Sequence, residues 1–218
     1  MNDLRITPFG SSGLLVEFAQ SIDPSSLALC RGLLRALDEN PIEGLREVTS
    51  AYQTILLEFQ DGHTPQVDQV KTILGAARPL PAEEITCHEI PVIYDGPDLA
   101  ALAQRHKLSV SEIVTRHSNP AYDVYLVGFS PGFPYLGPLD EKLHVPRLAT
   151  PRPRVPAGSV GIGGEHTGIY SIASPGGWWL IGRTDTVLFS EEAARGAGSE
   201  KAFLLRQGDR VKFIPIST

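Results

Sequence analysis

Three arginines lie close together on a proline-rich segment, and their spacing suggests that they bind an anion. Arg147, Arg152 and Arg154 lie within the run PRLATPRPRVPAGS, whose prolines hold the backbone extended. A guanidinium on a stiff segment can bind a carboxylate or a phosphate through two parallel hydrogen bonds. The spacing predicts an anion-binding role. The alternative, that these are ordinary surface arginines in water, stays open at this point.

Two further polar residues are candidates for catalysis. His117 ends a helix-like stretch and precedes Ser118-Asn119-Pro120. Because imidazole titrates near neutral pH, this histidine is a candidate general acid or base, or it merely complements the helix dipole. Arg183 stands inside a strand-like run, where an arginine must face solvent or find a partner.

A stiff aromatic loop follows the strand-like run YDVYLV. The segment Gly128–Asp140, GFSPGFPYLGPLD, carries Phe129, Phe133 and Tyr135 among prolines and glycines. Proline fixes φ and glycine permits positive φ, so the path of this loop is predicted to be rigid. Its aromatic rings either plug one end of a barrel or form the wall of a small-molecule pocket.

A second glycine-aromatic run is SPGGWW. Gly176 and Gly177 allow the backbone to approach a ligand closely, and Trp178 can cover that ligand with its ring. Adjacent residues on a strand point to opposite faces. We therefore expect only one of Trp178 and Trp179 to face a pocket, and the other to lie in the core.

The elements that position these residues fall into two groups. In residues 1–84, two strand-like runs, a helix after the Asp23-Pro24 cap signal, two more strand-like runs and a helix after Thr64-Pro65 predict a small α+β domain. Its sheet should be mainly antiparallel, with both helices on one face. The segment Arg78–Glu84, RPLPAEE, is the expected linker.

Residues 85–218 are predicted to form a mainly-β domain. It opens with a strand, EIPVIYD, and two short helices, over 98–107 and 109–117, the second introduced by the capping-box spacing of Ser109 and Glu112. Short strand candidates separated by glycine and proline then continue to the C-terminus, and TVLFS at 186–190 is one of them. This pattern favours a closed or nearly closed barrel.

Composition narrows the function classes. The chain has 218 residues, 42% of them hydrophobic, and a formal net charge of −6, which argues against a nucleic-acid-binding surface. It has neither a signal-peptide pattern nor an apolar run long enough to cross a bilayer, so we expect a cytoplasmic protein that binds no membrane. Cys30 and Cys87 lack metal-ligand spacing and are expected to be buried, reduced thiols.

Several catalytic motifs are absent from the sequence. It contains no GxxxxGK phosphate loop, no GxSxG and no HExxH. The glycine-rich run Gly161-Ile162-Gly163-Gly164 is better explained as a barrel turn than as a phosphate cradle, because no helix is expected after it. No ATP-binding motif is therefore predicted in this chain, and no metal site either.

The motifs nevertheless resemble a known family. The stretches VYLVGFSPGFPYLG at 124–137, PRLATPRPRVPAGSVGIGGEHTGIYSIASPGGWWLIGRT at 146–184 and QGDRVKFIPI at 207–216 are similar to the KipI or allophanate hydrolase subunit 1 family, whose members are also called B subunits of 5-oxoprolinase. The upstream HSNPAYDVY resembles another segment of that family. The resemblance is strong from about residue 117 to residue 216 and weaker before it.

The resemblance implies a fold, partners and a reaction. It implies an α+β N-terminal domain followed by a cyclophilin-like barrel, working with a second cyclophilin-like barrel protein, similar to the C component of 5-oxoprolinase, and with a protein similar to its A component. The hetero-oligomer would hydrolyse 5-oxoproline to glutamate at the expense of ATP, and this chain alone would be inactive. The family also implies two alternatives: a regulatory inhibitor of a sporulation-type histidine kinase, and a carboxyl-transfer partner as in urea carboxylase and allophanate hydrolase systems.

Together, the residues and the resemblance give a set of site residues. Phe129, Phe133, Tyr170 and Trp178 would line the substrate pocket. Arg147, Arg152 or Arg183 would hold a carboxylate or phosphate, and His117 would transfer a proton. The expected catalytic residues are His117 and Arg183, and the expected substrate-binding residues are Phe129, Phe133, Arg147, Arg152, Tyr170, Gly176, Gly177 and Trp178.

Overall fold

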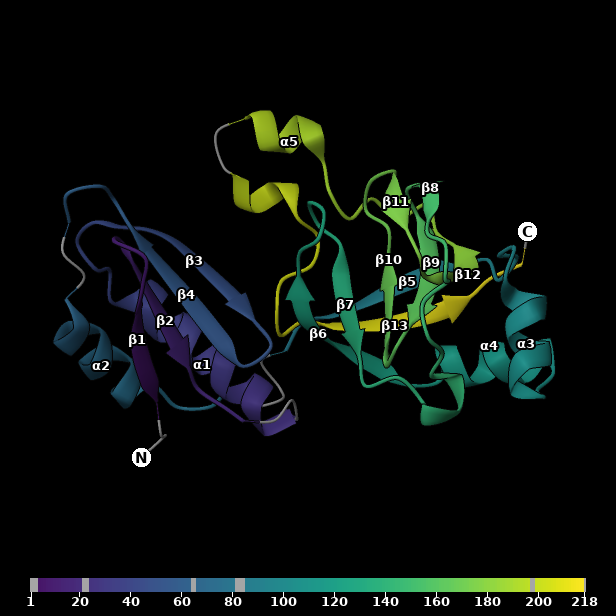
Figure 1. The fold of residues 1–218 in the computed structure, drawn as a ribbon, viewed down its shortest axis with the longest axis horizontal. Coiled ribbons are helices and arrows are strands. Elements are labelled where there is room, and N and C mark those ends of the chain that lie inside the picture. Colours follow the sequence, from purple (N-terminus) through teal and green to yellow (C-terminus); the bar gives the residue numbers. More distant parts are fainter. Residues whose placement is uncertain (1–3, 21–23, 64–65, 81–84, 197–198, 218) are drawn as a thin grey trace. The chain divides into compact units, whose positions relative to one another are not determined.

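The computed structural model describes residues 4–20, 24–63, 66–80, 85–196 and 199–217 (Figure 1). The chain divides into two compact units, residues 1–85 and 86–218, which we call unit 1 and unit 2. The expected cap residues Asp23 and Thr64-Pro65, and the linker residues 81–84, lie outside the described ranges. No helix in the described ranges is long and apolar enough to cross a membrane.

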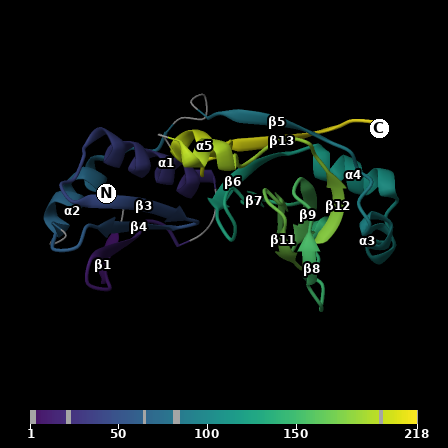
Figure 2. The same ribbon diagram turned by 90° about the horizontal axis from the view of Figure 1, so that it is seen from above.

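Unit 1 has a four-stranded antiparallel sheet with two helices on one face. The sheet order is β1-β2-β4-β3. Inward-facing residues alternate along β2 (Leu14, Val16) and β4 (Ile55, Leu57), and both helices bury their apolar stripes in the same cluster. Figure 2 shows α1 along one side of the sheet. The elements are β1 (Arg5–Phe9), β2 (Gly13–Glu17), α1 (Pro24–Glu39), β3 (Leu45–Ala51), β4 (Thr54–Phe59) and α2 (Val67–Ala76).

Unit 2 is built on a mixed seven-stranded sheet in the order β12-β9-β10-β7-β6-β13-β5. Only the pair β13 and β5 is parallel. Its strands are β5 (Cys87–Val92), β6 (Ala121–Val127), β7 (Pro134–Gly137), β9 (Ser159–Gly163), β10 (His166–Ile169), β12 (Trp179–Arg183) and β13 (Arg210–Pro215), and β8 (Arg152–Val155) pairs with β11 (Ser174–Gly176) in a separate ribbon.

The two edges of this sheet meet and close it into a barrel-like shape. The backbones of Ile93, just after β5, and Arg183, at the end of β12, exchange two hydrogen bonds of 2.9 Å. Gly182 lets the strands approach this closely, because a Cβ there would lie 2.6 Å from the Ile93 carbonyl oxygen. The mixed sheet is consistent with the cyclophilin-like barrel that the resemblance implies.

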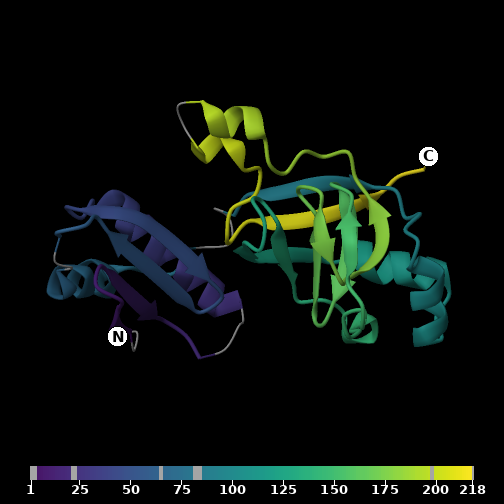
Figure 3. The ribbon, with the colours of Figure 1, turned by 45° about the horizontal axis from the view of Figure 1, so that its top comes forward.

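Two helices of unit 2 begin within one residue of the predicted positions. The helices α3 (Leu99–His106) and α4 (Val110–Ser118) pack together at one end of the unit (Figure 3). The predicted capping box is confirmed: the Ser109 hydroxyl accepts a hydrogen bond from the Glu112 amide, and the Glu112 carboxylate accepts one from the Ser109 amide. The helical segments η2 (Glu141–Leu143), α5 (Glu191–Arg195) and η3 (Ser199–Ala202) complete the unit.

Two local predictions are wrong. Residues 186–190 do not form a strand, and only Phe189 makes an isolated bridge, to Phe203. Cys87 is exposed at the start of the edge strand β5, whereas Cys30 is buried in α1 as expected. In both cases the apolar residue types were compatible with a buried strand, and the position in the folded unit decided otherwise.

Adding one methyl group at the closure should weaken unit 2. In Gly182→Ala the new Cβ would press against the Ile93 carbonyl, and we expect a loss of about 1–3 kcal/mol in unfolding free energy. Both tryptophans, Trp178 and Trp179, lie in unit 2, so tryptophan fluorescence in a urea titration reports this unit. Gly75→Ala is the matched control, because a Cβ at that helical position meets nothing within 4 Å. A wild-type urea midpoint for Gly182→Ala would contradict the role of the close approach.

Candidate functional site

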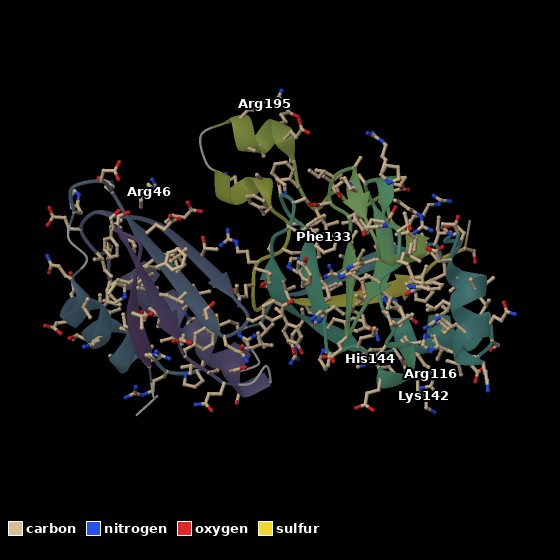
Figure 4. The ribbon with its side chains drawn as sticks, in the orientation of Figure 1. Arg46, Arg116, Phe133, Lys142, His144 and Arg195 are labelled. Atoms are coloured by element: carbon tan, nitrogen blue, oxygen red, sulfur yellow. The ribbon has the colours of Figure 1, made fainter. Side chains whose placement is uncertain are left out.

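The stiff loop after β6 is held by its own backbone. The Gly128 amide donates to the Phe133 carbonyl (2.9 Å), and the Phe133 amide donates to the Ser130 carbonyl (3.0 Å). The Ser171 hydroxyl donates to the Pro131 carbonyl from the neighbouring chain segment. These bonds turn the chain sharply and direct the Phe133 side chain into unit 2, where it is 2% exposed. Figure 4 labels Phe133.

Phe133 is the centre of an aromatic cluster. Four rings meet it in edge-to-face geometry, with centroid distances of 5.5 Å to Phe129, 5.2 Å to Tyr135, 5.2 Å to Tyr170 and 5.3 Å to Trp178. This is the geometry that aromatic quadrupoles prefer. Each ring therefore helps to fix its neighbours before any ligand binds.

The cluster surrounds a pocket of about 340 Å³, a size typical of small-molecule sites. All of the expected substrate-binding residues except Arg152 line it. Tyr135 also lines the pocket, which is one of the two roles predicted for the rings of the stiff loop, whereas Leu148, Pro151 and Pro175 were not predicted to line it. The lining residues are Phe129, Phe133, Tyr135, Arg147, Leu148, Pro151, Tyr170, Pro175, Gly176, Gly177 and Trp178.

Glycines allow these large rings to lie against the sheet. A Cβ at Gly163 would lie 2.6 Å from the Trp178 ring, and a Cβ at Gly176 would lie 2.2 Å from the Tyr170 hydroxyl oxygen. Any larger residue at either position would displace an aromatic wall. As expected, only one of the two tryptophans faces the pocket: the indole N–H of Trp179 instead donates to the Pro146 carbonyl (2.9 Å).

Arg147 is the charged side chain of the pocket lining. The other lining residues are aromatic or aliphatic side chains, prolines and glycines, and none of them is Asp, Glu, Lys or Arg. Its segment is fixed on both sides, because the Leu148 amide donates to the Gly177 carbonyl (2.7 Å) and the Pro146 carbonyl accepts from Trp179. Burial raises the pKa of Tyr170, and the Trp178 backbone amide, Arg147 and Arg152 oppose that shift. The pocket thus combines apolar walls with one net positive charge.

Arg152 lies behind the pocket wall. Its guanidinium bonds the Asp98 carboxylate (2.6 Å) and donates to the Trp178 carbonyl (3.3 Å). The other oxygen of Asp98 accepts from the Leu180 amide (2.7 Å). Because this guanidinium is already paired with a carboxylate, Arg152 positions the Trp178 segment and does not line the pocket.

Arg183 lies outside this pocket. Its guanidinium pairs with the Asp95 carboxylate at 3.0 Å, and it lines a different hollow, with Thr184 and Asp185. The strand β12 explains this placement, because Arg183 ends the strand at the closure of the barrel whereas Trp178 directly precedes the strand. The structure does not bring the two expected catalytic residues to the pocket.

His117 lies in the core of unit 2, with no exposed surface. Its ring stacks on Phe213 (4.6 Å). The Thr167 hydroxyl donates to the Gly161 carbonyl, so it accepts from His117 Nε2–H (2.7 Å), and Nδ1 accepts from the Tyr94 hydroxyl (2.7 Å). Burial lowers the pKa of His117 to about 3. These contacts are those of a neutral structural histidine.

His166, at the start of β10, is the histidine beside the aromatic cluster. Its ring meets that of Tyr135 with a centroid distance of 6.2 Å. Burial lowers its pKa, Glu165 opposes the shift, and His144 and Arg147 add to it. His166 was not among the predicted site residues, because the aromatic rings around it come from strands far apart in the chain.

A larger hollow of about 780 Å³ lies elsewhere on unit 2, between α4 and η2. It is more open and polar, and the ion pair of Arg116 and Asp140 (2.7 Å) lies in it. Figure 4 labels Arg116 far from Phe133. It has no aromatic wall, so we regard the smaller pocket as the candidate site. Among the described residues, no cluster of His, Cys, Asp and Glu could hold a metal ion.

Comparisons with known proteins agree on one family. The family model described as carboxyltransferase domain, subdomain C and D, matches residues 4–197. The B subunit of 5-oxoprolinase from Bacillus subtilis (strain 168) is 36% identical over 230 residues, which cover 98% of this chain and 93% of that protein. The B subunit of 5-oxoprolinase from Haemophilus influenzae is 54% identical over 129 residues, 58% of each chain.

A solved structure extends the comparison to the fold. The crystal structure of TTHA0988 matches with a TM-score of 0.82 and 35% identity, covering 94% of this chain. This chain spans 40% of the length of that protein. The similarity therefore applies to part of a longer chain.

The neutral state of His117 should make stability depend on pH. The folded state keeps this imidazole unprotonated down to about pH 3, whereas the unfolded state binds a proton near pH 6.5. The unfolding free energy should therefore fall as pH decreases below 6.5, and His117 should account for a loss of about 2 kcal/mol between pH 7.5 and 5.0. Urea titrations followed by tryptophan fluorescence measure it.

The variant His117→Gln isolates this contribution. It should be less stable than wild type at pH 7.5, because two buried hydrogen bonds are disturbed, yet lose less stability on acidification. His63→Gln, an exposed position in unit 1, should retain the wild-type pH dependence. Equal pH dependence of wild type and His117→Gln would show that His117 is not held neutral.

Proposed function

The chain belongs to the family of carboxyltransferase domains, subdomains C and D, and we propose that it is a subunit of an ATP-dependent 5-oxoprolinase complex. In this proposal its aromatic pocket binds 5-oxoproline or the intermediate derived from it. The observation that carries the proposal is the pocket itself, an apolar aromatic enclosure with one arginine and no acidic side chain. The similarity to named 5-oxoprolinase subunits gives the substrate.

The pocket suits the two chemical features of 5-oxoproline. Its five-membered ring presents apolar faces, for which Phe133, Tyr170 and Trp178 provide ring surfaces. Its carboxylate needs a cation, which Arg147 supplies through charge-assisted hydrogen bonds. The fixed walls orient the lactam and exclude water from one side of it.

Arg152 and Asp98 have a positioning role in this scheme. They hold the Trp178 carbonyl and the start of β12, so the wall is in place before the substrate arrives. The proposal assigns no proton transfer to His117, because both ring nitrogens are occupied in the core. Proton transfer to and from the lactam belongs to groups of the assembled complex.

ATP chemistry is not assigned to this chain. The glycine-rich run 161–164 lies on β9 and at its turn to β10, and no helix begins there to bind phosphate groups. The described residues therefore do not fit a nucleotide site of that kind. We propose that the partners similar to the A and C components of 5-oxoprolinase supply the nucleotide chemistry, and that the isolated chain is inactive.

Removing the charge of Arg147 should weaken substrate binding. A charge-assisted hydrogen bond contributes about 1.5–3 kcal/mol, so we expect Arg147→Met to lower the affinity for 5-oxoproline by about 10- to 100-fold. Pyrrolidin-2-one lacks the carboxylate and should bind wild type and variant equally weakly. Calorimetry on the purified chain, or KM in the assembled complex, measures the effect.

Arg183→Met, outside the pocket, is the control. Equal affinities of wild type and Arg147→Met for 5-oxoproline would refute the carboxylate assignment.

Reconstitution tests the activity. We expect the chain co-expressed with its partner subunits to release glutamate from 5-oxoproline and ATP, and the chain alone to release none. If the full set has no turnover but the chain inhibits a sensor histidine kinase, the regulatory alternative replaces the proposal. Transfer of a carboxyl group from a biotin carrier would instead favour the carboxyl-transfer alternative, which the name of the family model also suggests.

A further inference from the structure

Phe129 has a backbone conformation that its residue type disfavours. Its φ is +71°, in the left-handed region, where a side chain other than glycine is strained. Two other described non-glycine residues have positive φ, and each has an ordinary reason. Lys107 caps the C-terminus of α3, and Tyr52 lies in the two-residue turn between β3 and β4. Phe129 is neither a helix cap nor part of a two-residue hairpin turn.

Phe129 is also unusually exposed for an aromatic residue. Two thirds of its surface (66%) is accessible to solvent, and its ring contacts that of Phe133 edge to face. A loose loop does not explain this exposure, because the turn is closed by the hydrogen bonds of Gly128, Phe133 and Ser171. The fold therefore holds an apolar ring at the mouth of the pocket, in a strained conformation.

Glycine at position 129 would remove both the backbone strain and the exposed apolar surface. It adopts positive φ freely and exposes no apolar surface. Strained residues that the surrounding structure holds in place concentrate at ligand sites. The side chain of Phe129 is therefore best explained by a contact made only in a complex, and its place among the pocket-lining residues identifies a pocket ligand as the occupant.

We propose that Phe129 is a specificity-determining residue, whose ring covers the ring of a small cyclic carboxylic acid bound with its carboxylate at Arg147. This inference rests on the proposed function, since it concerns the same pocket. Beyond the proposed function, the pocket would prefer ligands that have a flat ring. Acyclic carboxylates of similar charge should bind more weakly because they leave the Phe129 ring uncovered.

Stability and binding should respond to Phe129 in opposite directions. We expect Phe129→Gly to keep or raise the urea midpoint of unit 2, because the backbone strain is relieved. The same variant should bind both 5-oxoproline and benzoate about tenfold or more weakly, as measured by calorimetry. Phe129→Ala should bind as weakly without the gain in stability, and Phe129→Tyr should restore most of the affinity.

Val187→Ala is the matched control. Val187 is 68% exposed and apolar but does not line the pocket, so this variant should change neither affinity. A lower urea midpoint for Phe129→Gly with unchanged affinities would show that Phe129 is structural, and overturn the inference. Unchanged affinities with lost co-purification of the partner subunits would show that Phe129 contacts a protein, which also overturns it.

Because binding is measured for two probes, 5-oxoproline and benzoate, a failure of this inference can be told apart from a failure of the proposed function. If wild type binds benzoate but not 5-oxoproline, the proposed substrate is wrong, and the benzoate affinities of the variants still decide the role of Phe129. If wild type binds neither probe, the pocket does not take cyclic carboxylates and both proposals fail.

Discussion

The carboxylate of Asp98 is the point on which the pocket of unit 2 depends. One oxygen holds the Arg152 guanidinium, and the other accepts from the Leu180 amide. The Asp98 amide in turn donates to the Leu180 carbonyl (3.0 Å), next to the bonds between Ile93 and Arg183 that close the sheet. A single side chain thus joins the closure of the barrel to the wall that carries Trp178. A partly buried ion pair of this kind gives little net stability, so we attribute its value to geometry.

The aromatic walls depend on a second constraint, the absence of side chains beneath them. Gly163 and Gly176 leave room for Trp178 and Tyr170, and Phe133 then contacts both rings edge to face. Rings fixed in this way need no rearrangement to receive a ligand, which lowers the entropic cost of binding. The exposed ring of Phe129 is the exception, and in our proposal a bound ligand covers it.

Much of the local structure could be predicted from residue types. The Ser109 capping box, the helices around it and most strands of unit 2 follow from capping, turn and alternation patterns that act over a few residues. The aromatic and glycine residues of the pocket were also identifiable, because stiff runs of glycine, proline and aromatic residues are uncommon outside constrained sites. The strand predicted at 186–190 failed, because β-branched and apolar residues there had no neighbouring strand to pair with along their length.

Residue types alone established which segments are stiff, which side chains are aromatic and which carry positive charge. They did not establish which group each charged or polar side chain pairs with in the folded chain. By residue type alone, three residues were equally good candidates for catalysis or ligand binding: His117, Arg152 and Arg183. Each has its hydrogen-bond partner far away in the chain, Thr167 at 50 residues, Asp98 at 54 and Asp95 at 88, respectively. The folded chain places His117 in the core, Arg152 behind the wall and Arg147 at the pocket. The physical reason is that the charge state and role of an ionisable group depend on its burial and on its partners in space, which the closure of the barrel brings together.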